Sequence, residues 1–285
     1  MEKPAEISYK MISVGSIRLH VALAGNHFGK PIILLHGFPD AHFGWEQQIH
    51  ALTASNFFVI APDQRGYNLS DKPKGKSNYK MYLLVEDVIY LADALNIDKF
   101  YLAGHDFGAM VAWNLMEKYS ARVNRLIIFN VPHPQILAQF LKNSKTQRKK
   151  SWYAFFFRIP LLPEILIRLT NMKMLSSAMK DSFSKDILNR YQIAWKQPGS
   201  LTAMLNWYRC MLKERNPKKN YSIIENPTMI VWGKKDPHLM WEMAPESAKM
   251  CQNAQVKFFE NASHWVLEDE AEKTSELLVK FCKKE

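Results

Sequence analysis

The sequence predicts an α/β protein whose mostly parallel, doubly wound sheet is interrupted by a helical segment. Short apolar runs alternate with helical patterns toward both ends of the chain, as expected for buried parallel strands and their connecting helices. This alternation stops between about residues 131 and 224, where Leu, Met, Lys and aromatic residues are frequent. A chain of 285 residues is long enough for a core domain that carries a smaller inserted domain.

Eight strands are expected, and the first two form a hairpin. Residues 7–12 and 17–23 are separated by Gly15-Ser16, which favours a turn. The remaining six strands are compact apolar runs at 31–35, 57–61, 99–103, 124–129, 228–232 and 255–259. Helices are expected at 79–95, 107–116 and 267–281, where apolar residues recur at helical spacing. Strands that alternate with helices in this way imply a parallel sheet.

The interruption predicts a helical cap inserted into the core. Residues 132–224 are expected to form this cap, and residues 1–131 and 225–285 the core. The cap has no clear strand pattern, and strand-helix alternation resumes after it, at Asn226-Pro227. Several helices are expected within it, broken at Pro160, Pro163 and Pro198.

Composition restricts the class of protein and its partners. Hydrophobic residues make up 47% and charged residues 23%, as in soluble globular proteins. The formal charge is +11, but the basic residues are mostly dispersed and no interleaved basic and aromatic motif occurs. We therefore expect no nucleic-acid partner, whereas a weak association with an anionic membrane surface stays open. The sequence does not indicate an oligomeric state.

The cysteines and the N-terminal residues indicate a cytoplasmic protein. Cys210, Cys251 and Cys282 are odd in number, far apart and without metal-ligand spacing, which argues against disulfides or a zinc site. The first residues, MEKPAEISYK, lack the apolar stretch of a signal peptide. No run reaches the length of about 18 apolar residues that a membrane-spanning helix needs.

A candidate nucleophile lies where a strand turns into a helix. The segment Gly104-His-Asp-Phe-Gly108 follows the run at 99–103 and opens the helix expected at 107–116. This G-x-D-x-G pattern is the nucleophile-elbow pattern with Asp106 where a serine is usual. A sharp turn crowds the backbone, so both flanking positions need glycine. The alternative is an ordinary turn in which Asp106 caps the helix.

Two further residues complete a candidate triad. An aspartate nucleophile forms a covalent ester, and a histidine base held by a second acid is needed to hydrolyse it. Asp236, in WGKKD, follows the strand expected at 228–232, and His264, in NASHW, follows the strand expected at 255–259. Considered alone, Asp236 could be an ordinary turn residue and His264 an ordinary helix cap. Their order along the chain and their positions beyond strand ends together favour catalysis.

The segment His36-Gly37-Phe38-Pro39 predicts an oxyanion hole. It follows the strand expected at 31–35, and its X-Pro bond can be cis and hold a tight turn. Such a turn would aim the Phe38 N–H at the carbonyl oxygen of Asp106, with the Phe107 N–H as the second donor. The alternative is an ordinary turn between a strand and a loop.

With these motifs the sequence resembles the epoxide hydrolase branch of the α/β-hydrolase superfamily. The resemblance covers nearly the whole chain and implies an eight-stranded sheet with helices on both faces and a helical cap. It rests on HGFPD (36–40), DQRGYNLSD (63–71), GHDFG (104–108), WGKKD and NASHW.

The resemblance also implies a role for two tyrosines of the cap. In that family two cap tyrosines hydrogen-bond the epoxide oxygen, and the segment NWYR at 206–209 resembles the second of them, which indicates Tyr208. The segment SWYAFFFRIP at 151–160 resembles the first and indicates Tyr153. Without the resemblance, packing within the helical segment is the simpler role for both residues. Further substrate-binding residues are expected at His36, Pro39, Trp207 and Trp265.

The implied reaction converts a small apolar epoxide and water into a vicinal diol. Asp106 attacks an epoxide carbon while Tyr153 and Tyr208 hold the oxygen, and His264, oriented by Asp236, then activates water to hydrolyse the ester. The resemblance implies no metal and no organic cofactor for this chemistry.

Two other functions stay open. Haloalkane and haloacid dehalogenases use the same set of an Asp nucleophile, a His base and a second Asp. The haloalkane enzymes usually carry Trp after the nucleophile and Asn after His-Gly, whereas this chain has Phe107 and Phe38 at these positions. Fluoroacetate-type enzymes carry arginines after the nucleophile, a stretch that holds Phe107 and Met110 here. A non-catalytic ligand-binding protein on the same fold is disfavoured by the intact set of Asp106, Asp236, His264 and the two tyrosines.

Overall fold

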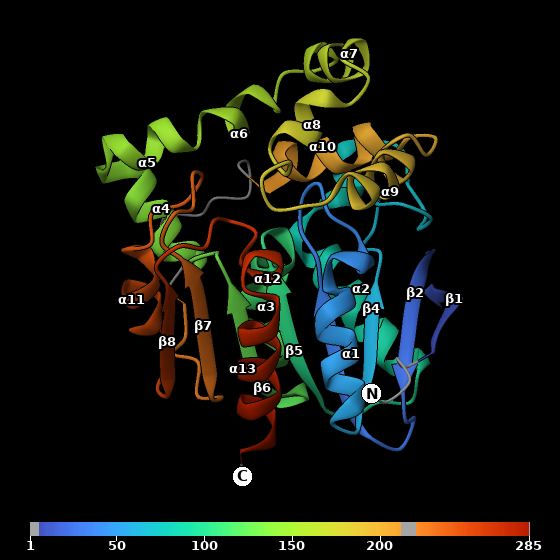
Figure 1. Cartoon of the computed structure of the whole chain (residues 1–285), viewed down its shortest axis with the longest axis vertical. Coiled ribbons are helices and arrows are strands. Elements are labelled where there is room, and N and C mark those ends of the chain that lie inside the picture. Colours follow the sequence, from blue (N-terminus) through green and yellow to red (C-terminus); the bar gives the residue numbers. More distant parts are fainter. Residues whose placement is uncertain (1–5, 212–220, 285) are drawn as a thin grey trace.

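The computed structural model describes residues 6–211 and 221–284, and one eight-stranded sheet forms its centre (Figure 1). The strand order is β1-β2-β4-β3-β5-β6-β7-β8, with β3 to β8 parallel and β2 antiparallel to both β1 and β4. All eight expected strands are present, within two residues at each end. They are β1 (Ile7–Val14), β2 (Ile17–Gly25), β3 (Lys30–Leu35), β4 (Phe57–Pro62), β5 (Phe100–His105), β6 (Val123–Phe129), β7 (Thr228–Gly233) and β8 (Ala254–Phe259).

Helices cover both faces of the sheet because each central strand is apolar on both sides. In β3, Ile33 and Leu35 face one hydrophobic cluster, and Ile32 and Leu34 face the other. The first cluster includes residues of α2 (Met81–Ala94), α3 (Phe107–Tyr119) and α11 (Met243–Ala248), and the second includes residues of α1 (Glu46–Ala54), α12 (Val266–Asp269) and α13 (Ala271–Lys283). Short 3-10 helices lie at η1 (His42–Trp45), η2 (Lys76–Tyr79) and η3 (Ser120–Arg122).

Two helix predictions need correction. The single helix expected at 267–281 is α12 followed by α13, because Glu270 leaves the helical conformation (φ −132°, ψ 46°) and its carbonyl accepts the Thr274 N–H that starts α13. Helix α1 was not predicted because its buried face carries the polar Gln48. The side-chain amide of Gln48 donates to the Leu267 carbonyl at 3.0 Å, so this face packs through a hydrogen bond rather than an apolar stripe.

Helices occupy the chain between β6 and β7. The described residues of this stretch form α4 (Pro134–Asn143), α5 (Lys145–Lys150), α6 (Trp152–Phe156), α7 (Leu162–Leu169), α8 (Lys173–Ser177), α9 (Lys185–Trp195) and α10 (Ser200–Met211). Figure 1 shows them above the carboxyl ends of the parallel strands. Pro160 and Pro198 lie between helices as expected, but Pro163 lies in the first turn of α7, where its missing N–H costs no helical bond. Residues 212–220 of the expected cap lie outside the described residues.

All three cysteines lie within the described residues, where they are buried and form no disulfide. In the described ranges, none of the helices combines the length and the apolar character that crossing a bilayer requires.

The tightest packing between sheet and helix lies at the start of α3. A Cβ atom built on Gly104 would lie 2.6 Å from the carbonyl carbon of Gly108, and one built on Gly108 would lie 2.1 Å from the Leu35 oxygen. Ala109 and Ala112 are fully buried on the same helix. The two glycines therefore let α3 approach β3 and β5 closely, which fixes the turn between β5 and α3.

Replacing Gly104 with alanine is expected to lower the free energy of unfolding by about 3 kcal/mol or more, because the added methyl group overlaps backbone that cannot move aside. The measurement is urea unfolding followed by tryptophan fluorescence.

Gly75→Ala is the matched control for that variant. It also adds one methyl group, but the nearest atom, the Ser77 hydroxyl oxygen, is 4.0 Å from the new Cβ. Only backbone strain at φ 86° and ψ 138° remains, with a cost of about 1 to 3 kcal/mol. Equal losses in the two variants would contradict the packing argument.

Candidate active site

Asp106 sits at the turn between β5 and α3 in a backbone conformation that side chains rarely adopt. Its φ is 48° and its ψ is −121°, and its carboxylate makes no capping hydrogen bond to the helix. Asp106 therefore occupies the N-cap position of α3, but its carboxylate does not cap the helix. A Cβ atom built on Gly37 would lie 2.2 Å from the Asp106 Cβ, so the neighbouring loop holds the turn from the other side.

The three expected triad side chains meet at the carboxyl ends of three strands. His264 Nδ1 lies 2.7 Å from Asp236 Oδ2, and His264 Nε2 lies 3.4 Å from Asp106 Oδ2. The side chain of Asp236 is fully buried, that of His264 is 4% exposed and that of Asp106 is 16% exposed. Of these three side chains, Asp106 is therefore the one that a small molecule can reach.

Asp236 is held from several directions. Its Oδ1 accepts the N–H groups of His238 at 2.7 Å and Leu239 at 2.9 Å, so it is also the turn residue that its sequence context suggested. Its Oδ2 accepts the Asn130 side-chain amide at 2.9 Å besides facing His264. These donors fix the carboxylate so that it can orient the imidazole.

The pKa values of the triad favour ionised carboxylates on both sides of a protonated imidazole. Burial would raise the pKa of Asp106, but the hydrogen bond and charge of His264 outweigh it and hold that pKa below its usual value. The same balance, with His264 again the main partner, lowers the pKa of Asp236 to about 2. Burial would lower the pKa of His264, whereas the two carboxylates raise it to about 10.

The loop after β3 donates a hydrogen bond to the candidate nucleophile. The Phe38–Pro39 bond is cis, and the Phe38 N–H donates to Asp106 Oδ1 at 2.7 Å. Phe107, the other expected donor, is the first residue of α3 and follows Asp106 directly. His36 is fully buried behind this loop, where its Nε2 accepts the Gln64 N–H at 3.0 Å.

Both expected tyrosines lie over the candidate nucleophile. Tyr208, on α10, packs its ring against Phe38 at 5.1 Å and Phe107 at 4.6 Å between centroids, and Tyr153, on α6, lies 6.1 Å from Tyr208. Among the described residues neither phenol has a hydrogen-bond partner. Burial, with a contribution from the charge of Asp106, raises the pKa of both phenols well above the ordinary value, so they are protonated donors.

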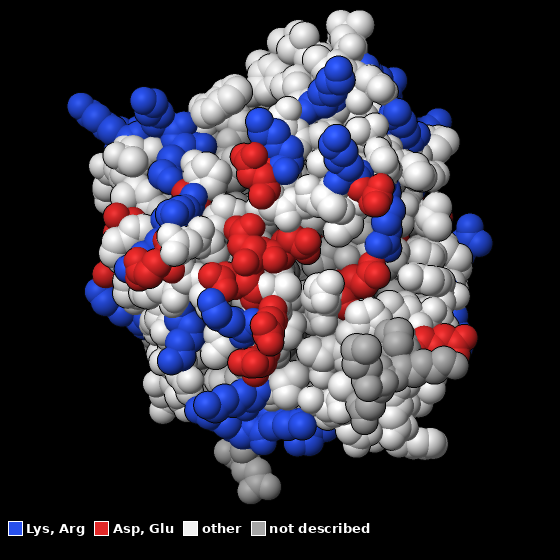
Figure 2. All heavy atoms as spheres, viewed as in Figure 1, with Lys and Arg blue, Asp and Glu red and all other residues white. Residues whose placement is uncertain are grey.

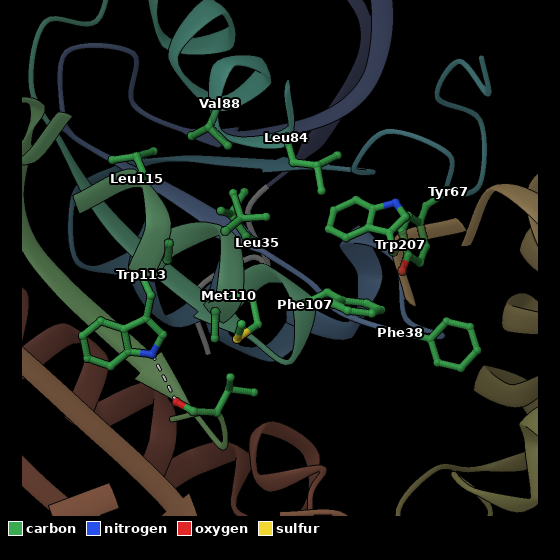
Figure 3. Close-up of a cluster of buried hydrophobic side chains, with 14 of the residues drawn as sticks. Leu35, Phe38, Tyr67, Leu84, Val88, Phe107, Met110, Trp113, Leu115 and Trp207 are labelled. Carbon is green, nitrogen blue, oxygen red and sulfur yellow. Dashed lines mark hydrogen bonds between the residues drawn. The ribbon is translucent and has the colours of Figure 1, made fainter. Parts of the chain in front are cut away.

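The remaining expected residues form the walls behind this space. Trp207 packs against Phe107 (Figure 3). Its indole N–H donates to the Arg65 carbonyl. Trp265 lies 5.3 Å from His264 between ring centroids and donates to the Ala178 carbonyl. The Pro39 carbonyl accepts the indole N–H of Trp195. The polar atoms of Trp207, Trp265 and Pro39 named here are therefore all paired within the protein.

Sequence reasoning missed Asn130 and His238. Asn130 follows β6 directly, at the same sheet edge as the triad, and applying the strand-end rule to this position would have identified it. The His238 ring lies 5.0 Å from Tyr153 and 5.2 Å from His264 between centroids. Burial and the charge of His264 lower its pKa to about 4, so it is neutral beside the protonated imidazole.

The sequence also did not indicate that helix α9 contacts the site. The Tyr191 hydroxyl donates to Asp40 Oδ1 at 2.6 Å, and Trp195 donates to Pro39. Arg190 pairs with Glu46 at 2.7 Å, one turn beyond the same loop. Helix α9 therefore fixes the loop that carries the Phe38 N–H.

Within the described residues, one group outside the site has the spacing of metal ligands. His20, His42 and Asp63 bring their ligand atoms within 4.8 Å of one another. The Nδ1 atoms of both histidines lie within 2.9 Å of the Asp63 carboxylate, which also accepts the Asn68 amide at 2.8 Å. These groups satisfy one another and tie β2 and η1 to the loop after β4.

The family model for the α/β hydrolase fold matches residues 30–271. The AB hydrolase superfamily protein YfhM of Bacillus subtilis is 37% identical over 283 residues, which cover 97% of this chain and 98% of that protein. Epoxide hydrolase 2 of Caenorhabditis elegans is 33% identical over 96% of this chain and 79% of its own length.

Solved structures of epoxide hydrolases are also similar to this chain. A crystal structure of a variant epoxide hydrolase from Bacillus megaterium has a TM-score of 0.89 and 29% sequence identity, over 96% of this chain and all of that one. Another variant of that enzyme was crystallised with its product (R)-3-[1]naphthyloxy-propane-1,2-diol. The chain therefore belongs to the α/β-hydrolase fold family, in the branch that includes these epoxide hydrolases.

Proposed function

We propose that this protein hydrolyses epoxides to vicinal diols through an ester on Asp106. The observation that carries the proposal is that the Asp106 carboxylate has a histidine-aspartate pair on one side and two phenols on the other. On one side, His264 lies between two carboxylates, with Nδ1 2.7 Å from Asp236 and Nε2 3.4 Å from Asp106. On the other side, Tyr153 and Tyr208 present phenols that have no hydrogen-bond partner among the described residues. An epoxide needs both a nucleophile and a donor for its oxygen.

In the first half-reaction a carboxylate oxygen of Asp106 attacks an epoxide carbon. A new C–O bond forms to the carboxylate, the ring C–O bond breaks, and its electron pair goes to the epoxide oxygen. A phenol of Tyr153 or Tyr208 donates a hydrogen bond to that oxygen and supplies its proton. The lowered pKa of Asp106 supports this step because it keeps the nucleophile ionised.

Ester formation prepares the second half-reaction. Asp106 loses its negative charge in the ester, so one of the two carboxylates that raise the pKa of His264 disappears and this pKa falls. The proton that His264 loses returns to the tyrosine that protonated the epoxide oxygen. The neutral imidazole then takes a proton from water, and the hydroxide attacks the Asp106 carbonyl carbon. The N–H groups of Phe38 and Phe107 stabilise the oxyanion. When the intermediate collapses, the diol leaves with a proton from His264, and the carboxylic acid formed at Asp106 returns its own proton to the imidazole.

We further propose that residues 132–224 act as a cap on a core formed by residues 1–131 and 225–285. Helices α6 and α10 support this division because they bring Tyr153 and Tyr208 to a nucleophile that belongs to the core. The site is lined by Phe38, Phe107 and the two tyrosines, which favours apolar and aryl-bearing epoxides. The naphthyloxy diol held by the Bacillus megaterium relative is consistent with this substrate class.

The reaction is tested with purified protein on two sets of substrates. Aryl and long-chain alkyl epoxides are offered in one arm and diol formation is followed by chromatography. Haloalkanes and haloacetates are offered in the other arm and halide release is followed. We expect diol formation that is lost in Asp106→Ala, because that variant has no nucleophile. Halide release without diol would support a dehalogenase instead.

Replacing His264 with glutamine is expected to trap the covalent ester. The variant keeps Asp106 and both tyrosines, so the first half-reaction proceeds, but no base activates water. Intact-protein mass spectrometry after incubation with an epoxide should show one added substrate mass. The double variant with Asp106→Ala is the control and should show no adduct. An unmodified His264→Gln protein that turns over at the wild-type rate would contradict the scheme.

Replacing Tyr153 or Tyr208 with phenylalanine is expected to slow ester formation by about 100-fold, because each change removes one donor to the epoxide oxygen. Single-turnover ester formation is measured in the His264→Gln background. Tyr101→Phe is the control, since Tyr101 is a buried tyrosine of β5 outside the site. Unchanged rates in both site variants would show that the phenols only pack.

A further inference from the structure

Helix α7 buries Pro163, Glu164 and Ile167 but exposes its remaining apolar residues. Its residues Leu162, Ile165, Leu166 and Leu169 are exposed, whereas its acidic residue Glu164 is buried. A surface helix normally has the opposite arrangement, with apolar residues toward the core. Glu164 is neutralised below the helix by Arg209, whose two guanidinium nitrogens donate to both carboxylate oxygens at 2.8 Å.

The exposed apolar surface extends beyond α7. Leu169 is 77% exposed, Leu161 is 70% exposed and Trp152 is 63% exposed, values that are unusual for side chains of this size. We call this surface the apolar tip, and its members are Trp152, Phe155, Ile159, Leu161, Leu162, Ile165, Leu166, Leu169 and Met174. A continuous stretch of chain that exposes this many large apolar residues marks an interaction surface. In Figure 1, α7 forms the end of the molecule farthest from the sheet.

Basic charge is concentrated in the same part of the chain. Residues 132–211 contain 13 Lys and Arg but only three Asp and Glu, a formal charge of +10 against +11 for the whole chain. Arg158, Arg168 and Lys173 lie within or beside the apolar tip, and Arg148-Lys149-Lys150 directly precede it. Figure 2 shows blue side chains around this end of the molecule, while the largest red group lies lower, over α12 and α13.

We propose that the apolar tip docks on the surface of a bilayer that contains anionic phospholipids. Apolar side chains with a basic rim match an interface in which acyl chains lie below negatively charged headgroups. A second copy of this chain is a poorer match, because two tips facing each other would bring two strongly basic surfaces together. Trp152 adds an aromatic side chain of the type that is enriched at membrane interfaces.

Docking through this surface would place the candidate site against the source of apolar substrates. On α6, Trp152 and Phe155 face outward, while Tyr153 faces His238 and the following Phe157 packs on Phe38. One short helix therefore carries both the outer surface and the roof of the site. The docking itself does not depend on the proposed reaction, so the two can be tested separately.

The test is flotation of the full-length protein with vesicles, with no substrate present. Vesicles of phosphatidylcholine with about 30% phosphatidylserine are compared with pure phosphatidylcholine. We expect binding to the anionic vesicles that is at least about tenfold stronger than to the neutral ones and that weakens when salt rises from about 0.1 M to about 1 M. Equal binding to both vesicle types, or no binding to either, would overturn the proposal.

A pair of matched variants separates docking from general charge attraction. Ile165→Glu/Leu169→Glu places two charges in the apolar tip, and Phe28→Glu/Tyr82→Glu places two charges at exposed aromatic residues elsewhere. The tip variant is expected to lose vesicle binding by about tenfold or more, while the control variant keeps most of it. Equal loss in both would overturn the proposal. Dimerisation of the wild type, measured by light scattering and abolished only in the tip variant, would instead assign the surface to a second copy.

Discussion

The packing of α3 against β3 and β5 is the constraint on which the rest of the site depends. Gly104 and Gly108 allow the helix to approach the sheet so closely that the chain between them must turn sharply, and Gly37 closes the same space from the neighbouring loop. Asp106 is forced into a positive φ at this turn and is lifted toward His264. The electrostatic properties of the triad follow from this placement.

The two halves of the site are held by different kinds of interaction. Asp236 and His264 lie on loops that follow β7 and β8, where backbone N–H groups and the Asn130 amide donate to the Asp236 carboxylate. The opposite half depends on hydrogen bonds between distant segments, above all those from Tyr191 and Trp195 of α9 to the loop that carries Phe38. The orientation of the Phe38 N–H is therefore coupled to the seating of the helices above the sheet.

The strands and the positions of Asp106, Asp236 and His264 could be predicted because short stretches of sequence indicate them. Each buried strand is a short apolar run, and each triad residue follows the end of one. Helix α1 lacked such a signal because Gln48 replaces an apolar contact with hydrogen bonds to residues more than 200 positions away. The bond between Tyr191 and Asp40 spans 151 positions, and no local pattern marks either partner. Long-range polar contacts of this kind became visible only in the folded chain.

The strained conformation at position 106 has a consequence for how this fold changes its chemistry in evolution. The backbone there is held by glycines and by packing, and the carboxylate makes no capping bond that maintains the turn. The side chain at the elbow can therefore change while the frame around it stays in place. A single substitution can exchange the carboxylate for the serine hydroxyl common at such elbows, so that the group presented at this turn can change in related chains without redesign of the core.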